Sequence, residues 1–453
     1  MARLCVHDAL LVTSEGRREG GVVVGDDGRI EALLAPGERA AAAATIDAAG
    51  KPLFAGFIDG HVHMRDPGFP AKETFASGTR AAAIGGVTTV LCMPNSAPPV
   101  ADLAGLEAAR RAAAGMSWVD YGFEAAATPA NTNALAELWA AGVVSFEALM
   151  SDAPAADRLE AADALARTLE AVAALDALLG VYTGEQAVID ARRAELEAAG
   201  RADPMAFVEA RPPESEAGGL ERLLTAPGAA DARLLLRQVC TRGGLERIAR
   251  ARVDAPARRL AVEVTPHHLQ LDTDAVRRHG GFALMAPPLR PADDVTAARA
   301  ALAAGEVDVV GSDHAPHAVD EKDRPRAWDV PGGTPGLDTL APAVLDLAAR
   351  GHLDLERVAA VLAERPAELF GLADRKGRLR PGADGDLVLV DLTARRVVTS
   401  GDVRSRAARS PFEDTELVGW PVATVLGGTV VARDGEVVGA PCGVWQRRAG
   451  AAA

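Results

Sequence analysis

The chain has 453 residues and a formal net charge of −15, with hydrophobic residues making up 49% of it and charged residues 25%. These values are ordinary for a globular protein with a large core, whereas the negative charge argues against nucleic acid or an anionic membrane surface as a partner. No apolar stretch reaches the ~18 residues of a membrane span, and the four widely spaced cysteines indicate no disulfide framework, so we expect a cytoplasmic protein.

Short β-branched runs separated by turns fill both ends of the chain. The run 21–24 is followed by the Asp27-Gly28 step and then by Ile30, which is a hairpin signal. The tail repeats this style at 386–390 and again around Asp434-Gly435. We therefore expect residues 1–52 and 376–453 to form one small β-sandwich domain together.

Between the two ends, short apolar runs alternate with segments rich in Ala, Leu, Glu and Arg. This alternation predicts βα units around a parallel sheet, and eight such units over ~320 residues fit a TIM barrel. We expect the barrel over residues 53–375, with a long loop at 210–229 covering its mouth. The predicted strands are 53–58, 88–93, 121–126, 143–150, 178–182, 234–239, 260–264 and 307–310.

The histidines are unevenly distributed, with none between His63 and His267. His61 and His63 follow the first predicted strand, and alternate residues of a strand point to the same face, so both imidazoles aim at one point, as metal ligands do. Asp313 follows the last predicted strand and offers a carboxylate that can bind a metal or accept a proton. The first and last strands of a barrel are neighbours, so these three side chains are predicted to meet at its C-terminal face.

Nine motifs occur in order along most of the chain, and together they resemble those of the cyclic amidohydrolases, the group of dihydroorotases, allantoinases and hydantoinases. The resemblance implies a TIM barrel with a β-sandwich built from both termini, a metal centre and hydrolysis of a C–N bond. It also implies that Arg65, Asn95 and His317 bind substrate, because they match substrate-binding positions of dihydroorotases. The motifs cover residues 56–68, 72–74, 85–89, 92–95, 265–269, 287–290, 312–317, 336–339 and 410–412.

The chain also departs from this group. Its members commonly hold two metals, bridged by a carbamylated lysine on the fourth strand, but no lysine occurs here between Lys72 and Lys322. Glu147 stands at the corresponding position, and because an unpaired buried carboxylate is costly, we expect it to bind metal. On the fifth and sixth strands, Thr183 and Gln238 replace the histidines that would hold a second metal.

We therefore expect one Zn²⁺, or another divalent cation, bound by His61, His63, Glu147 and Asp313. Such an ion lowers the pKa of a bound water to ~7. Asp313 would be the catalytic residue that takes the proton and delivers it to the leaving nitrogen. Gln238 would contact the substrate carbonyl in the place of a second metal.

The predicted function is hydrolysis of an amide, cyclic amide or amidine-like C–N bond by an enzyme with one metal. The substrate would be non-standard, for example a peptide-like or ring-bearing small molecule of specialised metabolism, and the protein a homo-oligomer, either a dimer or a tetramer. Two alternatives stay open. Arg65, Asn95 and His317 favour a genuine dihydroorotase or allantoinase. The reduced metal site would instead fit a catalytically inactive scaffold for a partner such as a transcarbamoylase.

Overall fold

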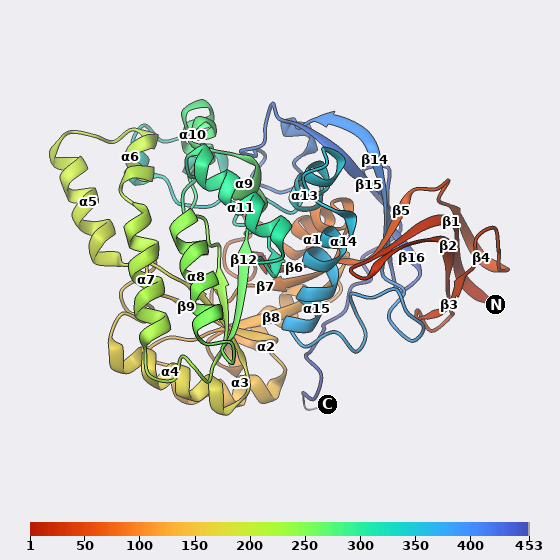
Figure 1. Cartoon of the computed structure of the whole chain (residues 1–453), viewed down its shortest axis with the longest axis horizontal. Coiled ribbons are helices and arrows are strands. Elements are labelled where there is room, and N and C mark those ends of the chain that lie inside the picture. Colours follow the sequence, from red (N-terminus) through yellow and green to blue (C-terminus); the bar gives the residue numbers. More distant parts are fainter. Residues whose placement is uncertain (452–453) are drawn as a thin grey trace.

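The computed structural model describes residues 1–451, and its centre is a barrel of eight parallel strands (Figure 1). Each strand pairs with the next one along the chain, which confirms the predicted TIM barrel. The main-chain N–H of His63 donates to His314 O at 2.8 Å, and this contact links the first strand to the segment after the last. The strands are β6 (Phe57–Val62), β7 (Val87–Cys92), β8 (Asp120–Ala126), β9 (Ser145–Leu149), β10 (Leu178–Tyr182), β11 (Arg233–Arg237), β12 (Arg259–Val264) and β13 (Val309–Val310).

Helices surround the barrel because each connection must return the chain to the same end of a parallel sheet. They bury their apolar faces on strands that are buried on both sides, and such strands read as continuous apolar runs. The helices are α1 (Phe75–Ile84), α2 (Leu103–Ala113), α3 (Leu135–Ala141), α4 (Ala162–Ala174), α5 (Gln186–Ala198), α6 (Pro204–Glu209), α7 (Pro213–Thr225), α8 (Arg242–Asp254), α9 (Pro266–Gln270), α10 (Thr273–His279), α11 (Ala292–Ala304), α12 (Val319–Lys322), α13 (Leu340–Ala349), α14 (Leu355–Ala359) and α15 (Arg365–Leu369).

The ends of the chain form one mixed sheet of nine strands beside the barrel, on the right in Figure 1. The short strand β5 joins the two ends, because it pairs in parallel with β1 and antiparallel with β14. This confirms a β-domain built from both termini. Its strands are β1 (Ala2–Thr13), β2 (Gly16–Val24), β3 (Ile30–Leu34), β4 (Ala42–Asp47), β5 (Pro52–Ala55), β14 (Leu387–Val397), β15 (Glu416–Leu426), β16 (Thr429–Arg433) and β17 (Glu436–Val437).

Two sequence predictions about local structure were wrong. The run 53–58 is not one barrel strand, because residues 53–55 belong to β5 in the terminal sheet and the barrel strand begins at Phe57. The segment 210–229 is not a long loop, because most of it is helix α7. Pro213 occupies the first turn of that helix, where a missing N–H costs nothing, and Leu220, Leu223 and Leu224 bury one face.

The barrel interior is layered. An apolar layer takes residues from or next to seven of the barrel strands and is closed by Phe370, which follows α15. Charged side chains lie above this layer, toward the C-terminal ends of the strands, and they position the site described below. The apolar residues are Ile58, Leu91, Val144, Leu178, Leu235, Ala261 and Val309.

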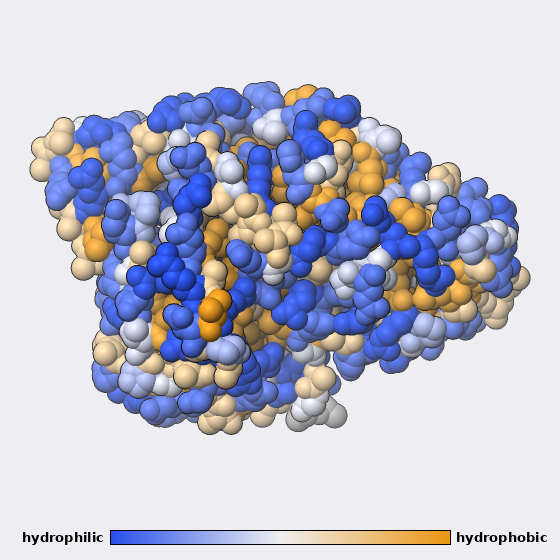
Figure 2. Space-filling view, in the orientation of Figure 1, coloured by the Kyte–Doolittle hydropathy of each residue, from blue (hydrophilic) through white to orange (hydrophobic). Residues whose placement is uncertain are grey.

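The outer surface is mainly hydrophilic on the face shown in Figure 2, with small hydrophobic groups scattered over it. Among the described residues, no helix is long and apolar enough to cross a membrane.

Candidate metal centre

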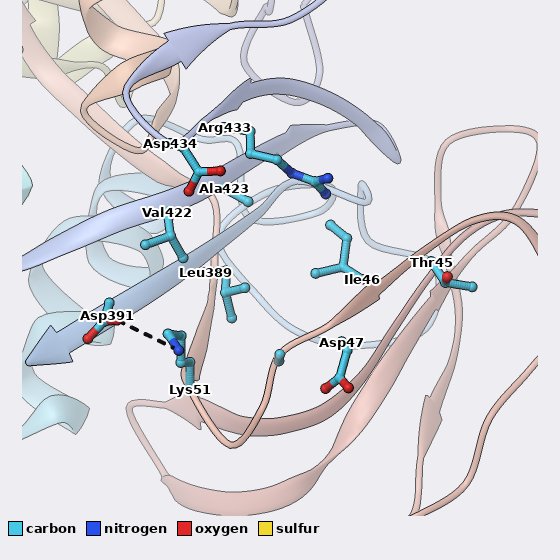
Figure 3. A pocket seen from close by; sticks show the side chains of 11 residues that line it. Thr45, Ile46, Asp47, Lys51, Leu389, Asp391, Val422, Ala423, Arg433 and Asp434 are labelled. Atoms are coloured by element: carbon cyan, nitrogen blue, oxygen red, sulfur yellow. Dashed lines mark ion pairs between the residues drawn. The ribbon is translucent and has the colours of Figure 1, made fainter. Parts of the chain in front are cut away.

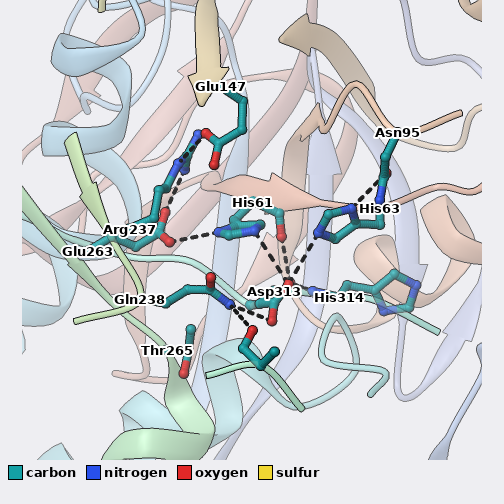
Figure 4. Close-up of polar contacts among 12 residues, drawn as sticks. His61, His63, Asn95, Glu147, Arg237, Gln238, Glu263, Thr265, Asp313 and His314 are labelled. Atoms are coloured by element: carbon teal, nitrogen blue, oxygen red, sulfur yellow. Dashed lines mark hydrogen bonds and ion pairs between the residues drawn. The ribbon is translucent and has the colours of Figure 1, made fainter. Parts of the chain in front are cut away.

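Three predicted site residues meet at the C-terminal face of the barrel (Figure 4). His61 lies near the end of β6, His63 follows that strand, and Asp313 follows β13. The Nε2 atoms of His61 and His63 lie 3.4 and 3.3 Å from the same oxygen, Asp313 Oδ1. Their potential ligand atoms all fall within 4.8 Å of one another.

The other nitrogen of each imidazole is held by an oxygen. His61 Nδ1 lies 2.7 Å from Glu263 Oε1, and His63 Nδ1 lies 2.8 Å from Asn95 Oδ1. Each Nδ1–H can therefore donate, which leaves Nε2 available to bind a cation or, when it carries a proton, to donate to Asp313. Histidines that bind metals usually have this arrangement, since the outer oxygen fixes both the tautomer and the ring orientation. The donor set thus fits a divalent cation.

Asp313 is held in place by its backbone and by Gln238. Its φ of 47° lies in the left-handed region, as do those of Gln238 (52°) and Arg65 (59°). Non-glycine residues adopt that region at a cost of ~1–3 kcal/mol, and such residues cluster at functional sites. Gln238 Nε2 donates to Asp313 Oδ2 at 2.6 Å. Burial alone would raise the pKa of Asp313, but His61 and His63 outweigh it and lower the pKa to about 2.

Glu147 lies outside this group of three. Its Oε2 accepts a hydrogen bond from Arg237 Nε at 3.0 Å, so the cation beside this buried carboxylate is a guanidinium. Its Oε1 is buried and has no hydrogen-bond partner within residues 1–451. The structure thus brings together three of the four expected metal ligands, and it pairs the fourth with a residue that the sequence analysis did not single out.

Arg237, at the end of β11, contacts three carboxylates. Besides Glu147, its Nη1 donates to Glu263 Oε2 at 2.6 Å, and its Nη2 donates to Glu124 Oε2. Glu263 also holds His61, so Arg237 is connected to the metal centre through a single side chain. The signal in the sequence was the presence of charged residues within buried strands, namely Glu124 in β8, Glu263 in β12 and Arg237 in β11.

Arg65, Lys72 and His317 meet at the edge of the site, where Glu321 pairs with Lys72 at 2.9 Å. Arg65 Nη2 lies 3.3 Å from His317 Nε2, and Lys72 Nζ lies 3.2 Å from His317 Nδ1. Burial, together with the charges of Arg65 and Lys72, lowers the pKa of His317 to about 3, so its ring is neutral at pH 7. Thr183 was predicted to stand in the place of a metal-binding histidine. It follows β10, and its side chain is buried and neutral.

Two hollows differ in their relation to the site. A cavity of about 190 Å³ is lined by Phe207, Trp328 and Ala286, among others. One of its lining residues contacts the site, because Gln238 Nε2 donates to Ala286 O at 3.4 Å. A larger hollow of about 400 Å³ lies in the terminal sheet near Lys51 and Asp391 and contains none of the predicted site residues (Figure 3).

The barrel and its metal-ligand group place the chain among TIM-barrel enzymes that use a metal ion. More specifically, the chain belongs to the amidohydrolase family, whose profile matches residues 53–203 and 252–431. It is therefore a hydrolase that acts on carbon–nitrogen bonds, as the motifs predicted.

Individual relatives match over nearly the whole chain. An L-hydantoinase of Paenarthrobacter aurescens is 31% identical and covers 97% of this chain and 96% of its own length. A dihydroorotase of Halobacterium salinarum is 38% identical over 91% of this chain and 96% of its own. An allantoinase of Rubrobacter xylanophilus is 35% identical over 94% of this chain and 95% of its own length. The solved structure of L-hydantoinase (dihydropyrimidinase) from Arthrobacter aurescens superposes with a TM-score of 0.95 at 31% identity, covering 99% of this chain and 100% of that one.

Proposed function

We propose that the protein uses one divalent metal ion, held by His61, His63 and Asp313, to hydrolyse a C–N bond in a small cyclic amide or a related ring. The observation that carries this proposal is the convergence of two Nε2 atoms on one carboxylate oxygen. When bound, such an ion supplies an activated water at neutral pH and polarises the bond that is attacked. The close relatives named hydantoinase, dihydroorotase and allantoinase support a cyclic substrate.

The side chains of the site divide the remaining work. Asp313 accepts a proton from the attacking water and passes it to the leaving nitrogen, which is general acid–base catalysis. Gln238 keeps the Asp313 carboxylate in one orientation through its hydrogen bond to Oδ2. Glu263 and Asn95 hold the two imidazoles by their Nδ1 atoms, so that the ligand geometry exists before the substrate arrives.

The surroundings of Arg65 support a negatively charged group on the substrate. Arg65 is partly buried, and its Nη2 contacts a neutral imidazole rather than a carboxylate. A carboxylate or another anion on the substrate would satisfy this guanidinium with strong charge-assisted hydrogen bonds. We propose a ring-bearing substrate with an acidic group. That the substrate is peptide-like stays a prediction, as do the dimeric or tetrameric state and the cytoplasmic location.

Elemental analysis of protein purified without chelator is expected to find about one divalent ion per chain, with zinc suited to the imidazole and carboxylate ligands. A second ion would lack ligands, because Thr183 and Gln238 are neutral and Glu147 accepts a hydrogen bond from Arg237. A His61→Ala, His63→Ala double variant should bind none. Two tightly bound ions per wild-type chain would refute the single-metal site, whereas no ion even after zinc is added would favour an inactive scaffold.

Dihydroorotate is the substrate of the second candidate function, which the contact between Arg65 and His317 favours. We nevertheless expect no appreciable dihydroorotase activity, because the carbonyl that two metal ions polarise in the group resembled would here meet only one ion. The test is the interconversion of dihydroorotate and carbamoyl aspartate, run in parallel with allantoin and hydantoin. A kcat/KM of ~10⁴ M⁻¹s⁻¹ or more, the lower end of the usual enzyme range, would establish the second candidate instead.

A further inference from the structure

A second group of charged residues lies in the barrel interior beside the metal centre. It consists of Arg237, Glu124, Glu147 and Glu263, and we refer to it as the Arg237 cluster (Figure 4 labels all but Glu124). The guanidinium contacts all three carboxylates, and its Nη1 also donates to Gly60 O at 2.8 Å. The four side chains come from four different strands, so the barrel itself sets the geometry of the cluster.

The cluster is closed to solvent and has more negative than positive groups. The side chain of Arg237 is 0% exposed, and its three partners are 0% to 3% exposed. Three carboxylates surround one guanidinium, and two of their oxygens, Glu124 Oε1 and Glu147 Oε1, are buried without a hydrogen-bond partner in the described chain. A buried carboxylate is costly unless it is protonated or compensated by a cation, and within this cluster Arg237 supplies the cation.

The surrounding barrel leaves space for a guanidinium. Gly180 in β10 faces the cluster, and a Cβ at this position would overlap with Glu147 Oε2 and Arg237 Nε. On the other side, the guanidinium carbon of Arg237 lies 5.7 Å from the ring centroid of Phe370, which closes the apolar layer. The arginine therefore fills the space between the apolar layer and the metal centre.

We propose that Arg237 is a built-in cation that balances Glu124, Glu147 and Glu263 and thereby keeps a second divalent ion out of the barrel. The proposal rests on the proposed function, because it takes the site at His61, His63 and Asp313 as the first ion's site. Oxygen atoms of several carboxylates are the ligands that hard divalent cations prefer. In this chain a covalently attached charge occupies the space among those oxygens, and Glu263 connects it to His61.

The test is to count metal ions in an Arg237→Ala variant. Wild-type and variant proteins are dialysed against Mn²⁺, freed of loosely bound ion and analysed for metal per chain. We expect about one ion in the wild type and about two in the variant, and about one again when Glu147→Gln is added to Arg237→Ala. Arg259→Ala is the matched control, because Arg259 begins the neighbouring strand β12 but is exposed and pairs with Asp176; it should keep the wild-type count.

The outcomes separate this proposal from the proposed function. The wild-type count tests the first site, whereas the gain of one ion on removing the guanidinium tests Arg237. A folded Arg237→Ala protein that gains no ion over the wild type overturns the role of Arg237 and leaves the first site standing. If the variant folds only when Mn²⁺ is present, the ion has replaced the guanidinium, since a ligand that binds only the native state stabilises it. Free guanidinium ion, added to the variant, could also replace the lost side chain. If the variant stays unfolded both with Mn²⁺ and with free guanidinium ion, the proposal is overturned.

Discussion

Asp313→Asn is expected to lower kcat by ~10²–10⁴-fold, the usual contribution of a general acid–base group, while the fold is kept. Asparagine has nearly the shape of aspartate and can still exchange a hydrogen bond with Gln238. Its amide oxygen cannot accept and hold a proton, so the attacking water loses its base. The wild-type carboxylate is ionised at neutral pH, because interactions with the two histidines keep its pKa low, so it has an oxygen that can accept the proton.

The measurement is kcat on an accepted substrate, with metal content determined on the same samples. Asp320→Asn is the matched control, because Asp320 lies close by in α12 but is exposed, and it should leave kcat unchanged. A lowered kcat with the metal retained assigns Asp313 the proton-transfer role, and loss of the ion assigns it the role of a ligand. Near-wild-type kcat in Asp313→Asn would exclude Asp313 as the base.

The group of His61, His63 and Asp313 could be predicted because strand periodicity and barrel topology together determine it. Two histidines at alternate positions share a face, and the ends of the first and last strands must meet when a barrel closes. No knowledge of the remaining side chains is needed for that argument. The predicted positions of Thr183 and Gln238 at the ends of β10 and β11 follow from the same topology.

The partner of Glu147 could not be predicted in this way. The sequence shows that a carboxylate within an apolar strand needs a cation, and a metal ion was the partner inferred. The structure supplies Arg237 instead, 90 residues later in the chain and on a strand two positions around the barrel. Periodicity tells which face of a strand is buried, but it does not tell which side chain reaches across the interior. Long arginine side chains make such contacts over distances that sequence spacing does not reveal.

The divided run at 53–58 had a similar cause. Both halves are apolar because both are buried, one in the terminal sheet and one in the barrel. The boundary is Gly56, where a Cβ would overlap with the side chain of Thr88. The close approach of two domains at this glycine is a tertiary feature, so the local pattern gave no sign of it.

Lys376→Met is expected to lower the free energy of unfolding by ~3–5 kcal/mol, the cost of removing one partner from a buried ion pair. Lys376 Nζ lies 2.7 Å from both Asp120 Oδ2 and Asp386 Oδ2, and 3.3 Å from Asp384 Oδ2. Asp120 begins the barrel strand β8, whereas Asp386 immediately precedes β14 of the terminal sheet. The ammonium therefore holds the two parts of the molecule together. Methionine would leave the buried carboxylates of Asp120 and Asp386 without a cation, whereas Asp384 would keep its ion pair with Arg375.

The measurement is urea-induced unfolding of both proteins at pH 7 and pH 9. Burial disfavours the charged lysine, but Asp386, Asp120 and Asp384 outweigh it and raise the pKa far above the ordinary 10.5. When the pKa of a lysine is higher in the folded than in the unfolded state, its contribution to stability is fully present below the unfolded pKa and is lost only at higher pH. Both pH values lie below the unfolded pKa, so the difference in free energy of unfolding between the two proteins should be the same at each. Lys51→Met is the control. The Lys51 ammonium lies 3.7 Å from Asp391 in the terminal sheet, and 36% of the lysine side chain is exposed. Such exposed pairs contribute at most ~1 kcal/mol to stability. If Lys376→Met were no more destabilising than this control, the three aspartates would not depend on the lysine charge, and the link between barrel and sheet would have to come from their apolar contact.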